Sequence, residues 1–323
     1  MFISKRKIKG NTYFYLEDRI DGKKISISLG KKEQVEERIK DAFEKINREK
    51  ALSNFKKTKK QKIKVLNDNE LLALEFLKIN YSLLKDFFPQ GFKSFKEDEF
   101  LRYAQGSTAV EGNSLSLQEA ALVIEKGTSI AGKKIEEIKE VENMKLAAEK
   151  SIKIREINEK SIKQIHSLIM KGFDEKNPGK YREEPIFITA SKVKPPRSDL
   201  VPKKMAELIN WLEKSGSKNM VEIYSEFHAR FEEIHPFVDG NGRTGREILN
   251  IMLQNNGYPR AIINLENRGS YIALLERVQV NKEYFKFSKF IYLCLEKRAQ
   301  EIRQIIDENK KNILLKIMNQ ALH

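Results

Sequence analysis

Long amphipathic stretches separated by glycine, proline and asparagine run from about Leu66 nearly to the end of this 323-residue chain. Phe227, Phe231 and Ile234 illustrate the pattern, because apolar residues three and four apart form one face of a helix. Pro236 then ends that helix. The pattern predicts a mainly α fold, and the chain is long enough for one large domain or two ordinary ones.

The first thirty residues follow a different pattern. Residues 12–16 are rich in β formers, Asp21-Gly22 is a hairpin signal, and residues 25–29 alternate with the period of a strand. We expect a small antiparallel β-meander over residues 1–32. A short helix over residues 33–51 and a solvated lysine-rich linker should follow, so that residues 33–65 form a basic helix and linker.

The segment 184–196 is an exception among the helices, because it is rich in β-branched residues and bounded by prolines. It predicts a short β-hairpin inserted in the helical region. An isolated hairpin is only marginally stable, so this one should pack on other elements or offer an edge for docking.

Most of the positive charge lies outside the helical region. Residues 1–66 contain 20 Lys and Arg against 9 Asp and Glu, a net charge of +11 of the +15 carried by the whole chain. Such a surplus favours acidic partners. We therefore weigh a nucleic-acid contact through residues 1–66 against a role of the same residues in recruiting a target protein.

The cellular compartment is predicted from cysteine content and hydropathy. Cys294 is the single cysteine, so no intrachain disulfide can form, and it lies in an apolar stretch that favours a buried residue. No segment has the apolar length that a bilayer requires, and the first ten residues lack the apolar run of a secretory signal. We expect a cytoplasmic protein without a membrane partner.

The densest group of chemically specialised residues is the segment 235–246, which lies in a loop between two apolar helices. Gly240 and Gly242 can adopt positive φ, so that successive N–H groups converge as an anion-binding nest before the second helix. Arg243 and Arg246 add guanidinium groups suited to phosphate. The segment also contains Asp239, a hard oxygen ligand for Mg²⁺, and His235, a base near neutral pH.

Each of these features alone has an ordinary explanation as a turn, a solvated arginine or a histidine cap. Their coincidence within twelve residues indicates a phosphate-binding catalytic site. The segment resembles the Fic-domain signature His-x-Phe-x-Asp/Glu-Gly-Asn-Gly-Arg-x-x-Arg at every specified position. Residues 178–182 resemble the family's Pro-Gly-x-aromatic-Arg element, and the resemblance extends over about residues 66–298, the predicted Fic domain.

The resemblance implies an enzyme that transfers AMP from ATP to a Ser, Thr or Tyr hydroxyl of an unknown target protein. By matching positions, His235 would deprotonate the hydroxyl, Asp239 would hold Mg²⁺, and Arg246 would hold the γ-phosphate. Gly242 favours nucleotidyl transfer, since relatives with lysine there act as kinases. The nucleotide-binding residues would be Gly240, Asn241, Gly242, Arg243, Arg246 and, on the adenine side, Tyr271.

Ser107 and Glu111 resemble the family's inhibitory motif, Ser/Thr-x-x-x-Glu-Gly/Asn, at the end of a helix predicted near residues 97–111. Their four-residue spacing places both on one helix face. The resemblance implies that Glu111 pairs with Arg246 and inhibits the chain in cis. The same glutamate could instead position water for deAMPylation, and sequence leaves both alternatives open.

The hairpin occupies the place of the family's flap, which would dock the target segment through Ile186, Ile188 and Thr189. A purely structural hairpin is an equal alternative. His228 precedes His235 by two helical turns, but no third ligand at metal-site spacing follows, so a packed histidine is favoured. The last stretch, 299–323, is predicted as a C-terminal helix that either mediates a homodimer or packs back on the chain.

Overall fold

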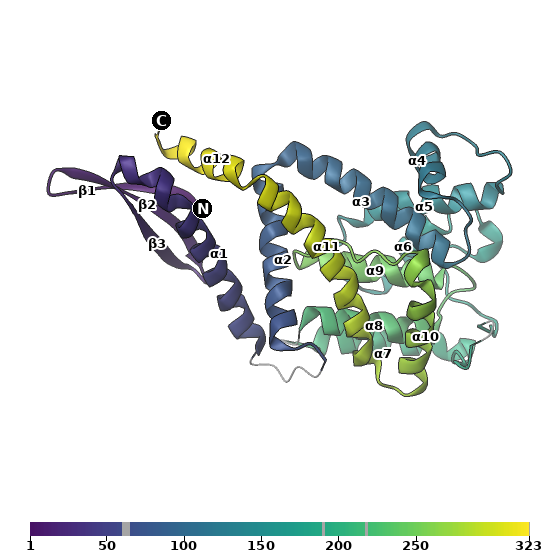
Figure 1. Ribbon diagram of the computed structural model, residues 1–323. Coiled ribbons are helices and arrows are strands. Elements are labelled where there is room, and N and C mark those ends of the chain that lie inside the picture. Colours follow the sequence, from purple (N-terminus) through teal and green to yellow (C-terminus); the bar gives the residue numbers. More distant parts are fainter. Residues whose placement is uncertain (60–64, 189–190, 217–218, 323) are drawn as a thin grey trace. The chain divides into compact units, whose positions relative to one another are not determined.

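The computed structural model describes residues 1–59, 65–188, 191–216 and 219–322 (Figure 1). Contacts divide the chain into two compact units. Unit 1 consists of Met1–Lys62, Asn67–Phe92 and Glu296–His323, and unit 2 consists of Ile63–Leu66 and Lys93–Leu295. Helices dominate the chain, so the predicted mainly α class is confirmed.

Unit 1 contains the predicted β-meander, a sheet of β1 (Phe2–Ile8), β2 (Asn11–Ile20) and β3 (Lys23–Gly30) in sequential antiparallel order. Leu16 at its centre pairs with Ile3 on one side and Ile27 on the other. Asp21 and Gly22 both have positive φ, as a tight turn between two twisted strands requires. The meander and its Asp-Gly hairpin are therefore confirmed.

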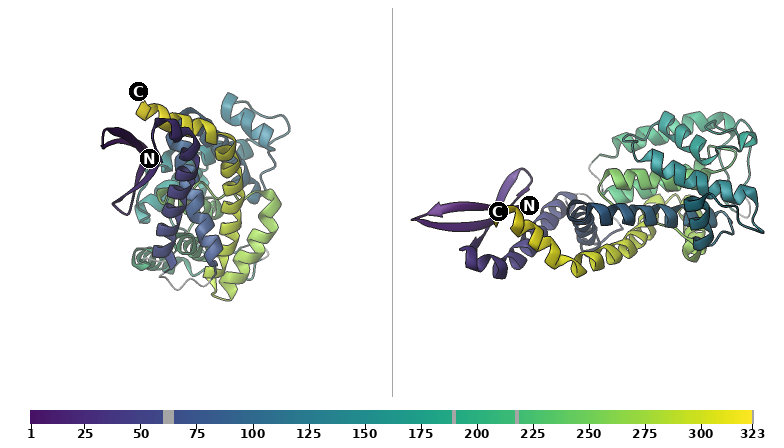
Figure 2. Two further views of the ribbon diagram at one scale, coloured as in Figure 1. Left: turned by 60° about the vertical axis from the view of Figure 1, so that its left-hand side comes forward. Right: turned by 90° about the horizontal axis from the view of Figure 1, so that it is seen from above.

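The helix α1 (Val35–Lys59) packs against β2 and β3 (Figure 2). Its residues Val35, Ile39, Phe43 and Ile46 are almost fully buried. The helix is longer than the predicted 33–51, and Lys56 and Lys57 belong to it rather than to a linker. Lysine has good helix propensity, and Lys57 also pairs with Asp21 of the sheet, which explains the extension. Residues 60–64 of the predicted linker lie outside the described residues.

Unit 1 also contains α2 (Asp68–Phe87), the end of α11 (Ser288–Glu308) and α12 (Lys310–Leu322). The predicted C-terminal helix is thus divided between α11 and α12. Helix α12 contacts β1, and its Ile313 and Ile317 are fully buried. The apolar face of residues 310–319 therefore packs back within its unit, which was one of the two predicted alternatives.

Unit 2 is helical and is organised around the contact of α8 (Met220–Ile234) with α9 (Asn241–Asn255) (Figure 1). Helices α5 (Ile135–Ser151) and α6 (Glu159–Ile169) contact α9, whereas α7 (Val201–Lys214) and α10 (Arg268–Val280) contact α8. The unit also contains most of α3 (Pro89–Val110), α4 (Leu117–Lys126), the start of α11 and the short helical turns Asp174–Lys176, Ser198–Leu200, Leu265–Asn267 and Tyr284–Phe287.

Local signals explain where α3 and α4 meet. Helix α3 ends at Val110, and Gly112 has a φ of +107°, which interrupts the helical backbone. Ser116 accepts a hydrogen bond from the Glu119 N–H at 3.2 Å, and Glu119 accepts one from the Ser116 N–H at 2.7 Å. This reciprocal pair is a capping box, and it opens α4. Together these signals leave Glu111 directly after the last residue of α3.

The segment 184–196, the flap, forms a loop in its described part. The Ser191 N–H donates to the Ile188 carbonyl at 3.2 Å, so the segment turns there, but none of its described residues belongs to a strand. The expected hairpin strands are therefore absent from residues 184–188 and 191–196. Thr189, a predicted docking residue, lies outside the described residues. Instead of strand pairing, the flap has contacts with Arg182 and with Glu276 of α10.

Two further predictions concern burial and hydropathy. Cys294 is a free, buried cysteine, as its apolar surroundings predicted. Among the described residues, every helix is too short or too polar to cross a bilayer.

Candidate active site

The loop between α8 and α9 is fixed by its own backbone and side chains. Helix α8 ends at His235, whose φ of +49° reverses the chain before Pro236. The Asn241 side chain accepts a hydrogen bond from the Phe237 N–H and donates one to the Phe237 carbonyl, both at 2.9 Å. Phe237 itself is fully buried. Asn241 therefore holds the loop closed from within, before any phosphate binds.

A histidine outside the motif supports the same loop. The His166 ring stacks on Phe237 with 3.7 Å between ring centroids. Its Nδ1 accepts a hydrogen bond from the Gly179 N–H at 2.8 Å, so Nε2 carries the proton and donates to the Asp239 carbonyl at 3.0 Å. Burial lowers the pKa of His166 to about 4, which keeps this arrangement uncharged.

Gly240 is required by the same packing. It has a φ of +71°, and a Cβ at this position would lie 2.6 Å from the Met170 sulfur. Any side chain would therefore be strained by its backbone and would also force the Met170 side chain to move. The predicted positive φ is confirmed at Gly240, whereas Gly242 lies inside α9.

His235 has the protonation state that a general base needs. Its Nδ1 lies 3.2 Å from the Glu232 carbonyl, which can only accept, so Nδ1 carries the proton and Nε2 carries the lone pair. Burial lowers the pKa of His235 below its ordinary value, against the opposing effects of the Glu232 carbonyl and the Glu111 charge. The imidazole is therefore neutral at pH 7 and can take up a proton.

Arg246 is 1% exposed and is held by the end of α3. Its Nε donates to the Ser107 hydroxyl at 3.0 Å, and its Nη2 donates to the Ser107 carbonyl at 2.8 Å and to Glu111 Oε1 at 2.7 Å. Burial tends to raise the pKa of Glu111, but the charge of Arg246 and its hydrogen bond outweigh it and hold the pKa below its ordinary value. The carboxylate of Glu111 is thus ionised and paired with Arg246.

Gly242 makes this pairing possible. A Cβ at residue 242 would lie 2.2 Å from Glu111 Oε1 and 2.9 Å from Arg246 Nη1. The Glu111 carboxylate occupies the space that a side chain at residue 242 would need. Gly242 therefore has a steric role in the contact between α3 and α9, in addition to any role with phosphate.

The position of α3 depends on a second, fully buried arginine. Arg260 makes two hydrogen bonds to the Glu247 carboxylate of α9, and its backbone N–H donates to Glu99 of α3 at 3.1 Å. Its guanidinium carbon lies 4.5 Å from the centroid of the Tyr103 ring. These contacts join α3 to α9 two turns before Ser107, which places Ser107 and Glu111 beside Arg246.

Asp239 is suited to a cation shared with phosphates. Its side chain is 44% exposed, and its Oδ1 accepts a hydrogen bond from Arg243 Nη2 at 3.2 Å. Within the described ranges, no group of three or more His, Cys, Asp or Glu residues could form a protein-only metal site. Mg²⁺ is commonly held by one or two carboxylates together with substrate phosphates and water, so Asp239 fits such a site.

A cavity of about 610 Å³, the motif cavity, joins these groups. Its lining includes His235, Asp239, Gly240, Asn241, Gly242, Arg243, Arg246, Glu111 and Tyr271. Tyr271 is 3% exposed, and its hydroxyl lies 2.9 Å from His228 Nε2 and 3.4 Å from Arg246 Nη1. The structure thus brings the predicted motif and inhibitory residues together, and His228 is the packed histidine that we expected.

The flap reaches the motif cavity through Phe187, Ile188 and Ser191, whereas Ile186 is not part of its lining. Arg182, from the predicted Pro-Gly-x-aromatic-Arg element, donates from Nε to the His235 carbonyl at 2.9 Å and from Nη2 to the Pro196 carbonyl at 2.5 Å. It therefore ties the end of the flap to the motif. At its turn the flap contacts α10, where Glu276 Oε1 accepts from the Lys192 N–H at 2.5 Å and the Ser191 hydroxyl at 3.3 Å.

Several residues of this site were not predicted from the sequence. Glu232 and Glu276 line the motif cavity, and Glu140 of α5 binds Arg243 Nη1 at 2.9 Å. A signal for Glu232 was present, because His228, Glu232 and His235 follow the i, i+4, i+7 spacing of one helix face. Glu140 and Glu276 lie on separate helices, and nothing in their local sequence relates them to the motif.

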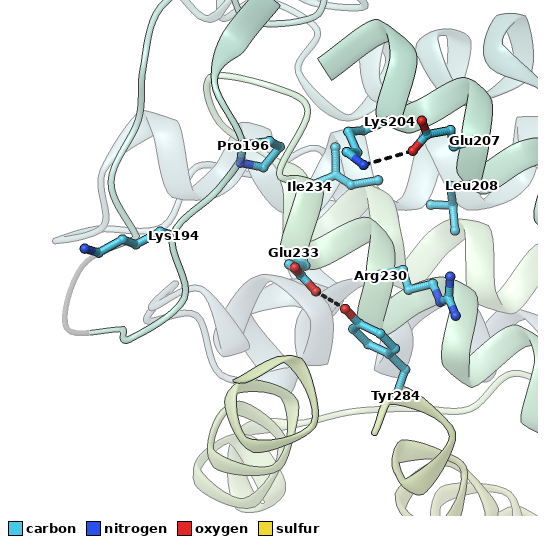
Figure 3. A pocket seen from close by; sticks show the side chains of 9 residues that line it. All are labelled: Lys194, Pro196, Lys204, Glu207, Leu208, Arg230, Glu233, Ile234 and Tyr284. Carbon is cyan, nitrogen blue, oxygen red and sulfur yellow. Dashed lines mark hydrogen bonds and ion pairs between the residues drawn. The ribbon is translucent and has the colours of Figure 1, made fainter. Parts of the chain in front are cut away.

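A second, smaller cavity of about 290 Å³ lies on another side of α8 (Figure 3). Tyr284 donates to Glu233 there at 2.5 Å, and the guanidinium carbon of Arg230 lies 4.9 Å from the Tyr284 ring centroid. None of the predicted site residues lines this cavity. The predicted motif residues therefore gather at the motif cavity and not at this one.

Comparison with known proteins agrees with this geometry. The model of the Fic/DOC family matches residues 156–253, which include the whole loop from α8 to α9. The chain is similar to the protein adenylyltransferase fic-1 of Caenorhabditis briggsae, with 31% identity over 57% of this chain and 37% of that protein. It is also similar to the protein adenylyltransferase Fic of Drosophila virilis, with 28% identity over 76% of this chain and 51% of that protein. The chain thus spans about a third to a half of the length of these relatives.

Solved structures share the fold. A Fic domain containing signaling protein from Bacteroides thetaiotaomicron superimposes with a TM-score of 0.66 at 20% identity, over 71% of this chain and 95% of that one. Fic-1 from C. elegans superimposes with a TM-score of 0.63 at 24% identity, over 75% of this chain and 73% of that one. The family model thus matches the part of the chain that carries the complete motif, and the solved structures share the fold around it.

Proposed function

We propose that this chain is a protein adenylyltransferase that transfers AMP from ATP to a Ser, Thr or Tyr hydroxyl of a target protein. The observation that carries the proposal is the gathering of a neutral histidine, a partly exposed carboxylate and two buried arginines around one cavity of about 610 Å³. The names of the curated relatives support the same activity.

In the proposed reaction, the target hydroxyl oxygen bonds to the α-phosphorus of ATP while the bond from that phosphorus to the bridging oxygen breaks, and pyrophosphate leaves. His235 Nε2 takes the hydroxyl proton. Arg246 holds the γ-phosphate, and Asn241, Gly242 and Arg243 hold the remaining phosphate oxygens. Asp239 would hold Mg²⁺, which supplies charge neutralisation when bound. Positioning and charge neutralisation provide most of the rate in such reactions.

The proposed resting state is inhibited by Glu111. Its carboxylate uses the Arg246 guanidinium that the γ-phosphate needs, with the two groups 2.7 Å apart. Ser107 binds the same guanidinium only through neutral oxygens, so the charged Glu111 carboxylate is the group that must leave Arg246 before ATP binds productively. Inhibition therefore acts in cis.

The central test uses labelled ATP and the full chain. Glu111→Gly should raise auto-AMPylation sharply, because Arg246 becomes available, and Glu111→Gln should give an intermediate rise. His235→Ala in the Glu111→Gly background should reduce transfer by about 10²–10⁴-fold while ATP binding is retained. Transfer at the parent rate without His235 would disprove the catalytic assignment, and unchanged activity of Glu111→Gly would disprove the inhibition.

Removal of AMP at the same site is an alternative favoured by the position of Glu111, whose side chain lines the motif cavity and is 40% exposed. A carboxylate there could position a water molecule for attack on the phosphodiester. Wild-type chain incubated with an AMPylated target should then release AMP, and Glu111→Gly should not. Release by both proteins would exclude this role of Glu111.

For the flap we infer a docking role for Ile186 and Ile188. Ile188 lines the motif cavity, and the neighbouring Phe187 is 91% exposed. An exposed apolar segment beside a catalytic cavity can bind an extended peptide through its backbone. Ile188→Pro should lower target modification more than ATP binding, and an equal loss of both would favour a purely structural flap.

A nucleic-acid contact through residues 1–66 is a second candidate function, favoured by the outer face of the sheet. Asp18 pairs with Lys50 of α1, so its neighbour Glu17, the residue before it in the strand, faces away from α1. Glu17 is fully buried beneath Arg6 and Lys24, each 2.6 Å away. The single negative charge of Glu17 thus holds Arg6 and Lys24 in place, and these three groups together carry a net positive charge on that face.

Fluorescence anisotropy with a DNA duplex would test this contact in the full chain. The affinity should fall steeply between 50 and 200 mM salt, as expected for phosphate contacts, on the order of 10³-fold if six phosphates are bound. Arg19→Ala, which removes an exposed cation on the face of Glu17 and spares Glu17, should weaken binding at each salt concentration. Affinity that is independent of salt and of Arg19 would exclude the contact.

A further inference from the structure

The side chain of Glu232 lines the motif cavity but takes no part in the proposed reaction. It lies on α8 one turn before His235 and is 6% exposed. Its Oε1 is buried and has no hydrogen-bond partner among the described residues. This oxygen occupies the space that a side chain at Gly245 would need, since a Cβ there would lie 2.3 Å away. The part of the chain that the structure describes thus makes room for this buried carboxyl oxygen and provides it with no hydrogen-bond partner.

The surroundings of Glu232 determine its charge. Arg246 is the nearest cation, but its hydrogen bonds go to Ser107, Tyr271 and Glu111. Glu111 already neutralises that guanidinium at 2.7 Å. A second ionised carboxylate, buried and without a donor, is strongly disfavoured, whereas a protonated carboxyl group only needs a partner for its O–H. The geometry therefore favours the acid form.

We propose that Glu232 binds the nucleotide as an uncharged carboxylic acid, donating its proton in a hydrogen bond to the ATP that occupies the motif cavity. The inference rests on the proposed function, because it requires ATP in this cavity. The protonation of Glu232 would be a condition for binding, since the cavity accepts the anionic nucleotide only while Glu232 keeps its proton. An ionised Glu232 would repel the phosphates and would have no hydrogen to donate.

The pKa values of the neighbouring groups agree with this role. Burial raises the pKa of Glu232, the charge of Arg246 opposes that rise and the charge of Glu111 adds to it, so that the pKa is about 8. The groups that face it from each packed element are Glu111 after α3, His228 and His235 of α8, Arg246 of α9 and Tyr271 of α10.

None of these neighbours changes charge between pH 7 and 9. Burial lowers the pKa of His228 to about 3 and that of His235 below its ordinary value, so both are neutral. The pKa of Tyr271 is raised by burial, and the pKa of Glu111 is lowered by Arg246. A change in ATP affinity across this pH range therefore reports on Glu232.

The test measures ATP binding by isothermal titration calorimetry at constant free Mg²⁺ between pH 6.5 and 9.5. The full chain carries Glu111→Gly, so that Arg246 is available, and this parent is compared with the same chain carrying Glu232→Gln. The affinity of the parent should fall about tenfold per pH unit above the pKa of Glu232, which lies near or below pH 8 once Glu111 is gone. The glutamine variant, which keeps a donor without a charge, should change less than about twofold.

Two further variants make the result specific. Glu233→Gln is the matched control, because Glu233 is the next residue of α8, binds Lys282 and Tyr284, and lines the other cavity (Figure 3). It should retain the parent's pH profile. Glu232→Met fills the same space without a donor, so it should bind ATP about tenfold more weakly at pH 7 and with no fall at high pH.

Proton uptake gives an independent readout. At pH 8.5, ATP binding to the parent should take up close to one proton, measured by repeating the titration in buffers of different ionisation enthalpy, and the glutamine variant should take up none. An identical pH profile and proton uptake in both chains would overturn the inference. So would a glutamine variant weakened at every pH, because Glu232 would then act as a charged partner of Arg246. Loss of ATP binding by the folded parent at pH 7 would overturn the proposed function and this inference together.

Discussion

The turn from His235 to Arg246 and the flap of residues 184–196 line the same cavity but are held in different ways. The turn is fixed internally, since Asn241 makes two hydrogen bonds of 2.9 Å to buried Phe237. The flap has an exposed Phe187 and depends on contacts to other elements, such as the one from Lys192 to Glu276. The groups expected to bind phosphates are therefore preorganised, whereas the segment that would meet the target has few contacts of its own.

Removing the internal support of the turn should have the largest effect. Asn241→Ala leaves the Phe237 N–H and carbonyl without their partner, and in the Glu111→Gly background AMP transfer should fall by about 10²–10³-fold, as for a lost positioning group. The measurement is transfer of labelled AMP. Asn250→Ala is the matched control, since Asn250 lies on the same helix as Asn241 and makes a similar pair of hydrogen bonds, to the Ala261 backbone after that helix. If both variants lost activity equally, the special role of the turn would be refuted.

The burial of Glu232 beneath the turn should make stability depend on pH. Its pKa of about 8 lies above the ordinary 4.5, so the folded chain binds the proton more tightly than the unfolded chain. Its contribution is complete below pH 4.5 and is lost as pH rises toward 8. The free energy of unfolding of Glu232→Gln, relative to that of the wild type, should therefore be higher at pH 8 than at pH 5, by on the order of a few kcal/mol.

Urea unfolding at both pH values would check this prediction. Glu233→Gln provides the comparison, because that carboxylate is paired with Lys282. A glutamine variant of Glu232 with the wild-type pH dependence would show that the buried group keeps an ordinary pKa.

Loosening the flap should have a smaller, more selective effect. Glu276→Ala removes the acceptor of the Lys192 N–H and Ser191 hydroxyl, so target modification should fall about tenfold, the equivalent of one or two hydrogen bonds. ATP binding should stay within about twofold. Glu283→Ala, which removes a carboxylate paired with Lys286, is the control. An equal loss of ATP binding would mean that Glu276 acts on the cavity rather than on the flap.

The smallest effect is expected beside the flap, at the exposed pair of Arg197 and Asp199. Their atoms lie 3.0 Å apart, but both side chains are more than half exposed. Asp199→Asn should change the free energy of unfolding by less than about 1 kcal/mol, because solvent screens such pairs. Thermal unfolding would detect a larger change, which would show that the flap is held by its surface charges after all.

The two regions also differ in how well their sequences predicted them. The turn was predicted as a loop between two helices with positive φ at Gly240, which is confirmed, whereas the positive φ also expected at Gly242 is wrong, because Gly242 lies inside α9. The strand propensity of the flap predicted a hairpin, but the described residues form a loop that is held by Arg182 and Glu276. Those contacts join distant parts of the chain, and local propensity yields when tertiary contacts supply the backbone's partners.

By itself, the sequence determined the mainly α class, the N-terminal meander, the turn from His235 to Arg246 and the identity of Glu111 as a candidate partner of Arg246. Each depends on residues near one another in the chain or on a motif of fixed spacing. Only the tertiary structure decided that Gly242 makes room for Glu111, that Arg260 joins α3 to α9, and that Glu232 is buried without a partner. These properties depend on which helices meet and how much water they exclude, and desolvation of a carboxyl group is set by the whole surrounding fold rather than by its neighbours in sequence.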